Sequence, residues 1–107
     1  MILKLVIQEQ VYPVTVPDDI VTEAEDFFSK LDHDMDKGWQ MSRDWVDKPD
    51  AEQRCQIIGD RLLTAMHNDN KQMMALLSAY ILARVPGVSA IRIDTNGEML
   101  ETELVID

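Results

Sequence analysis

The sequence predicts an α+β fold of two layers, in which one antiparallel sheet, built from an N-terminal and a C-terminal β-hairpin, packs against three to four helices. Apolar and polar residues alternate at both ends of the chain, as they do in strands. The segments between them have the period of a helix. A length of 107 residues suits one hydrophobic core, so residues 1–107 are expected to form a single domain.

Residues 2–16 are expected to form two strands, separated by a polar turn near Glu9 and Gln10. Apolar side chains share one face of each strand: Leu3, Leu5 and Ile7 in the first, and Tyr12, Val14 and Val16 in the second. Pro13 has no N–H to donate, which predicts that the second strand lies at an edge of the sheet.

The first helix is expected to start at Asp18, or at the capping pair of Thr22 and Glu25, and to end near Leu31. Ser42 is a suitable cap for a short helical piece that contains Trp45 and Val46.

A longer helix should follow, because Asp50 and Gln53 form a capping pair and are followed by an apolar stripe of Ala51, Cys55, Ile58, Leu62 and Ala65. Residues 71–85 are apolar on nearly every side, which predicts a central buried helix or one shared with a second copy. A homodimer is therefore one expectation for this chain.

The C-terminal hairpin is predicted around Asn96-Gly97, the preferred pair for a two-residue type I′ turn. Such a turn would pair Ile93 with Leu100 and Ile91 with Thr102 on the core face. It would also place Arg92 opposite Glu101 on the outer face.

The net charge of −10 argues against nucleic acid and anionic lipid as partners, since both would be repelled. Residues 18–50, which we call the acidic segment, hold eleven Asp or Glu and four Lys or Arg, or −7 of the −10. A partner is expected to be cationic, either a metal ion or a protein with a basic surface.

Cytoplasmic localisation is expected because Cys55 is the only cysteine and cannot form an internal disulfide. The N-terminus does not have the pattern of a signal peptide. The longest apolar stretch, 73–85, is too short to cross a bilayer and contains Arg84, so no membrane association is expected.

The run DHDMDKGW places carboxylates at Asp32, Asp34 and Asp36, the spacing of positions 1, 3 and 5 in a calcium loop. Residues 32–44 thereby resemble an EF-hand loop, which implies calcium as a ligand. The resemblance departs from the pattern at Lys37, which replaces the turn glycine, and at Arg43, which replaces the closing glutamate. If Lys37 is an insertion, Gly38 makes the turn and Asp44 closes the site.

Two readings of this stretch stay open. In the first, Asp32, Asp34, Asp36 and Asp44 hold a divalent cation. In the second, the acids cap the neighbouring helix ends and keep a turn solvated.

No motif supports an enzyme: the chain has no glycine-rich phosphate loop and no GxSxG, CxxC or HExxH pattern. Cys55 lies on an apolar stripe, and neither His33 nor His67 has an evident catalytic partner, so no catalytic residue is proposed. A site assembled from residues far apart in the sequence remains the third class of function.

Trp39, Met41 and Trp45 follow the acidic run and have two readings, core lining or a contact patch for another protein. The main expectation is a small non-enzymatic protein that acts through protein contacts made by its acidic helix–loop–helix segment. Calcium binding by residues 32–44 is the alternative, and no other cofactor is expected.

Overall fold

The computed structural model describes all 107 residues. The helices are α1 (Asp18–Glu23), α2 (Glu25–Asp36), α3 (Ala51–His67) and α4 (Lys71–Arg84), with one 3₁₀ turn, η1 (Met99–Glu101). The strands are β1 (Ile2–Ile7), β2 (Gln10–Thr15), β3 (Trp39–Met41), β4 (Asp44–Val46), β5 (Val88–Arg92) and β6 (Glu103–Ile106).

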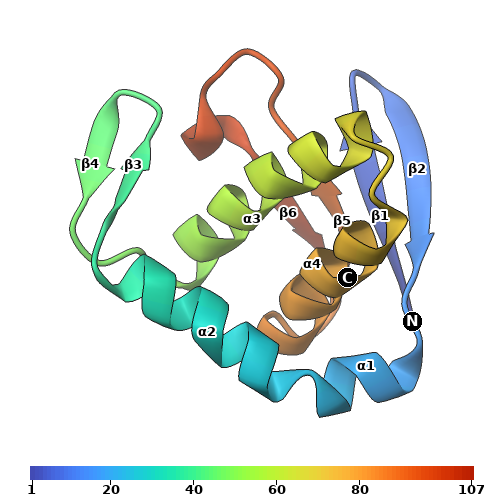
Figure 1. Ribbon diagram of the computed structural model, residues 1–107. Helices are drawn as coiled ribbons and strands as arrows, with labels where there is room; N and C mark the ends of the chain where they lie inside the picture. Colours follow the sequence, from blue (N-terminus) through green and yellow to red (C-terminus); the bar gives the residue numbers. More distant parts are fainter.

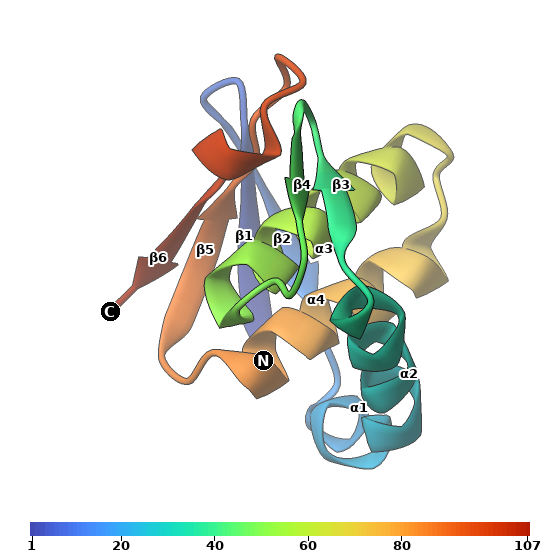
Figure 2. The ribbon, with the colours of Figure 1, turned by 90° about the vertical axis from the view of Figure 1, so that its left-hand side faces the viewer.

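Four strands form the main sheet in the order β2-β1-β5-β6, and β3 and β4 form a separate hairpin. The outer pairs of the main sheet are antiparallel, and the central pair of β1 and β5 is parallel. Helices α3 and α4 lie along one face of this sheet (Figures 1 and 2). The predicted α+β fold is therefore confirmed, with strands from both ends of the chain in one sheet. The sheet is mixed rather than antiparallel as predicted, because β1 and β5 run parallel.

The N-terminal hairpin forms as the alternation predicted. Leu3, Leu5 and Val14 are buried on the face that meets the helices, and β2 is an edge strand. The turn comes one residue earlier than expected, because Ile7 pairs with Gln10 and the two residues between them have positive φ.

Helix α3 starts with the predicted capping box. The Gln53 N–H donates to the Asp50 carboxylate at 2.8 Å, and the Asp50 N–H donates to the Gln53 side chain at 2.9 Å. Gly59 allows α3 to pack closely on the sheet, since a Cβ there would lie 3.0 Å from Cδ1 of Ile91. One cluster of 22 buried hydrophobic residues fills the space between the layers.

Helix α4 is the central buried helix that its composition predicted. Every residue from 77 to 82 is buried, and the helix contacts α1, α3 and β2. These neighbours cover its apolar sides within one chain, so α4 gives no ground for a homodimer. No helix has the length and apolar character needed to cross a membrane.

The predicted two-residue turn at Asn96-Gly97 is wrong. Arg92 pairs with Glu103 rather than Glu101, and residues 93–102 leave the ladder as a longer loop that contains η1. The Asp94 carboxylate accepts the N–H groups of Asn96 and Glu98, both at 2.9 Å, and so holds the chain in a turn that competes with strand pairing.

Two helix predictions in the acidic segment are also wrong. The first helix breaks at Ala24 into α1 and α2, and α2 continues five residues past Leu31 to Asp36. The stretch expected to form a helix after Ser42 is instead the β3–β4 hairpin, whose turn places Ser42 at a φ of +60°. This hairpin projects beside α3 (Figure 2).

Candidate functional site

Asp32 is the centre of an ion-pair network that joins three helices. It lies on α2, and its carboxylate receives hydrogen bonds from Arg54 on α3 and from Tyr80 and Arg84 on α4. The Arg54 N–H lies 3.2 Å from Oδ1, and the Arg84 Nε–H lies 3.0 Å from Oδ2. The network therefore fastens α2 to the two helices that cover the sheet.

The two arginines also bind other groups on α2 and its neighbours. Arg84 makes a two-pronged ion pair with Glu25, with N···O distances of 3.0 and 2.9 Å. Arg54 donates to Asp36 at 2.6 Å and to the Pro49 carbonyl at 2.9 Å. Both ends of α2 are held in this way.

Partial burial raises the pKa of Asp32, but the hydrogen bonds from Tyr80, Arg84 and Arg54 outweigh it, and the net pKa lies below the ordinary value. Burial, together with the hydrogen bond to Asp32, raises the pKa of the Tyr80 hydroxyl. Asp32 therefore stays ionised and Tyr80 stays protonated near neutral pH.

A cavity of about 300 Å³ opens beside this network, lined by Asp32, Pro49, Ala51, Arg54, Tyr80 and Arg84. Oδ1 of Asp32 accepts hydrogen bonds from Arg54 and Tyr80, and Oδ2 accepts one from Arg84 and lies 2.9 Å from a second nitrogen of the same guanidinium. Both oxygens of the carboxylate are therefore already engaged by groups of the protein. We interpret the cavity as the solvent-facing side of a structural network.

The calcium prediction assumed a loop from 32 to 44, and that assumption is wrong. Asp32, Asp34 and Asp36 lie on helix α2, where alternate residues point to different sides. Asp32 and Asp36 are bound by Arg54, Asp34 is exposed and has no ion pair, and Asp44 is on β4. No three His, Cys, Asp or Glu side chains are placed to hold a metal ion. Calcium binding stays a prediction to which this geometry adds no support.

The three residues of the predicted contact patch have different surroundings. Met41 is fully buried in the core, and Trp39 is half-buried against it. Trp45 is 57% exposed on the opposite side of the hairpin. Met41 and Trp39 thus anchor the hairpin, whereas Trp45 is exposed to solvent.

Trp45 is held in place despite its exposure. Its indole N–H donates to the Asp47 carboxylate at 2.7 Å. Its ring lies against Gly38, where a Cβ would come within 2.5 Å of the indole and where φ is +99°. Glycine at 38 is therefore needed for this position of the indole.

The surface of the acidic segment is strongly negative. Four of its eleven acids are in ion pairs: Asp18, Glu25, Asp32 and Asp36. The other seven make no ion pair and are exposed: Asp19, Glu23, Asp26, Asp34, Asp44, Asp47 and Asp50. Two of the seven, Asp44 and Asp47, flank Trp45 in the sequence.

The one cysteine and the two histidines of the chain have different surroundings. Cys55 is buried in the core, and burial raises the pKa of its thiol to about 12, which keeps it protonated and inert. His33 and His67 are both exposed, one on α2 and the other at the end of α3.

Sequence reasoning missed Arg54, Tyr80 and Arg84 as partners of Asp32. They follow Asp32 by 22, 48 and 52 residues, too far for any local pattern to connect them. One signal was present: Tyr80 and Arg84 are four residues apart in an otherwise apolar helix and so share one side of it.

Comparison with protein-family models, with curated proteins and with solved structures found no match to this chain.

Asp32→Asn is expected to lower the free energy of unfolding at pH 7 by roughly 2–3 kcal/mol, because two partly buried arginines lose their shared carboxylate. Asp34→Asn is the matched control. Its carboxylate is exposed and unpaired, so the change should stay within about 0.5 kcal/mol. Urea unfolding measures both, and equal effects would contradict the assignment.

Comparing wild type with Asp32→Asn also tests how the stability of the fold depends on pH. The pKa of Asp32 is lower in the folded state than in the unfolded state, so its ionised form stabilises the fold above an unfolded-state pKa of about 4. That contribution is lost as the pH falls through the lower, folded-state value. The difference in stability between wild type and Asp32→Asn should therefore shrink on acidification below about pH 4. A difference that is constant from pH 7 to acid would contradict this.

Calcium chloride and sodium chloride at matched ionic strength are expected to change the unfolding midpoint and the tryptophan fluorescence equally, since both only screen the exposed acids. Thermal unfolding of wild type and Asp34→Ala measures the effect. A saturable response to calcium alone, absent in Asp34→Ala, would instead establish a metal site.

Proposed function

We propose that this protein is a non-enzymatic binding protein whose acidic segment contacts a basic protein partner. The exposed, fixed indole of Trp45 on the β3–β4 hairpin is the observation that carries the proposal. Tryptophan is enriched among the residues that dominate binding energy, and a residue already held in place loses little entropy on binding.

The charge around Trp45 supports the choice of partner. The seven unpaired acids of the segment, two of them flanking Trp45, would attract a basic surface and repel an acidic one. The partner surface is expected to combine Lys or Arg with an apolar centre that covers the indole. An amphipathic basic helix has this chemistry.

The hairpin is also built to support a contact. Met41 fixes β3 in the core. At the turn, the Ser42 hydroxyl oxygen accepts the Met99 N–H at 2.9 Å and so joins the hairpin to the loop before β6. Trp45 therefore projects from a supported element rather than a loose loop.

The test uses a helical peptide of Leu and Lys as the partner, with binding measured by calorimetry. Trp45→Ala is expected to weaken binding by about tenfold or more, because the indole supplies the apolar contact. Leu100→Ala is the matched control, since it removes an apolar side chain that is also exposed, at 41%, but lies on η1. Sodium chloride should weaken binding to wild type.

A second experiment tests the contribution of the acidic residues to binding. Neutralising Asp44 and Asp47 to Asn should weaken binding of the Leu/Lys peptide several-fold more than neutralising Asp60 and Asp69, which changes the net charge equally at exposed sites outside the acidic segment. A Leu/Glu peptide should not bind. Equal binding by Trp45→Ala and wild type, or by the Leu/Glu and Leu/Lys peptides, would contradict the proposal.

A further inference from the structure

The uncovered face of the main sheet is the second large surface of this molecule. Helices α3 and α4 lie on the other face, and no element crosses this one (Figures 1 and 2). The strand registers bring its outward side chains into two rows. They are Val11–Val6–Arg92–Glu103 and Pro13–Lys4–Ala90–Val105, with Ile2 and Thr15 beyond the second row.

The apolar part of this face is exposed to an unusual degree. Ile2 is 54% exposed and Val11 is 55% exposed, and the half-buried Val6 lies between Val11 and Arg92. A sheet that leaves one face in solvent normally carries polar residues there, so several exposed Ile, Val and Pro residues on that face are typical of a contact surface.

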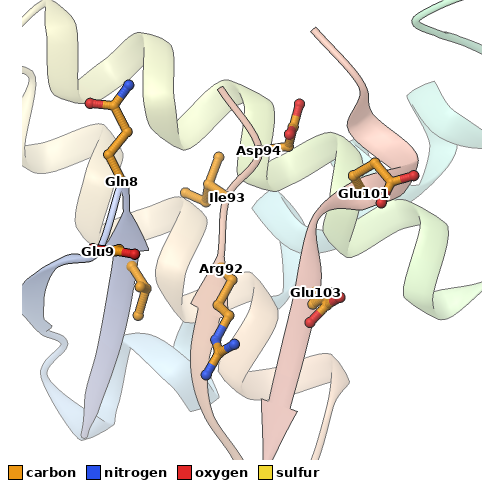
Figure 3. A pocket seen from close by; sticks show the side chains of 8 residues that line it. Gln8, Glu9, Arg92, Ile93, Asp94, Glu101 and Glu103 are labelled. Carbon is orange, nitrogen blue, oxygen red and sulfur yellow. The ribbon is translucent and has the colours of Figure 1, made fainter. Parts of the chain in front are cut away.

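The charges of the face are mixed, unlike those of the rest of the molecule. Figure 3 shows Arg92 and Glu103 on neighbouring strands, with Glu9, Asp94 and Glu101 toward the same end of the sheet. These side chains line a hollow of about 480 Å³. With Lys4 included, the face and the hollow carry two basic and four acidic residues, a net charge of −2 out of −10. None of these six side chains takes part in an ion pair within the chain.

The charges on this face favour a second copy of the chain as the partner. Two copies of a molecule with a charge of −10 repel each other over most of their surfaces, and this nearly neutral face is where they can approach most closely. A second copy also brings both signs of charge, so the unpaired Lys4 and Arg92 of one copy can meet the unpaired glutamates of the other.

We infer that the uncovered sheet face is a homodimer interface, in which two sheets pack face to face around Ile2, Val6 and Val11. The resulting dimer has four layers, with the helices on the outside and both acidic segments free. The edge of β2 does not supply the contact. The N–H groups of residues 11 and 15 face that edge, but Pro13 between them has no N–H for a continuous strand ladder.

Sedimentation equilibrium of the full chain over roughly 5–500 µM tests the interface. We expect a reversible increase from the monomer to the dimer mass. Added sodium chloride should strengthen this association by screening the repulsion between copies, whereas it should weaken binding of a basic peptide. A pure monomer over the whole range would overturn the inference.

Val11→Glu is expected to raise the dissociation constant of the dimer at least tenfold, because it buries a charge within the apolar contact. Leu100→Glu is the control: it adds the same charge at an exposed apolar residue off the sheet face and should leave most of the dimerisation intact. Ile2→Glu serves as a second variant if Val11→Glu does not fold by circular dichroism. A dimer that resists the sheet-face substitutions, or one equally weakened by Leu100→Glu, would place the interface elsewhere.

Discussion

The ion pairs of Asp32 with Arg54 and Arg84 hold together parts of this protein that the hydrophobic core alone joins weakly. Helix α2 is rich in charged residues and buries only Phe28, Leu31 and Met35. The Arg84 guanidinium adds to this contact, because it lies over the rings of Phe28 and Tyr80 at 5.7 and 5.4 Å. Since α2 leads directly into β3, its attachment also fixes the base of the β3–β4 hairpin and therefore the position of Trp45.

The two surfaces proposed for binding, the acidic segment and the uncovered sheet face, differ in charge. They are therefore expected to bind different kinds of partner. The acidic segment carries −7 and has an exposed indole, which suits a basic protein. The sheet face carries −2 and has exposed aliphatic side chains, which suits a second copy. The two surfaces belong to different elements, so a dimer through the sheet would present two copies of the acidic segment and could bind a repetitive basic partner with higher avidity.

Features of the fold with a local cause were predictable from the sequence. The alternation in β1 and the capping box of Asp50 and Gln53 each depend on residues a few positions apart, and both are confirmed. The end of α2 was not predictable, because Asp32 is neutralised by Arg54 and Arg84, which lie on other helices. The turn after β5 was also missed, since the Asp94 side chain binds the Glu98 N–H, which would have closed the Asn-Gly turn.

The candidate site was likewise predictable only in the features that have a local cause in the sequence. The sequence showed its tryptophans and acids. It did not show that Met41 is buried and Trp45 is exposed, because this depends on the segment forming a β-hairpin rather than the predicted helix. Amide hydrogen exchange of Asp32→Asn, with Asp34→Asn as the control, tests most directly whether the Asp32 network fixes this region. Faster exchange confined to α2 and the β3–β4 hairpin, with β1 and β5 unchanged, is the predicted result. Unchanged exchange in α2, or an equal increase throughout the sheet, would contradict the account.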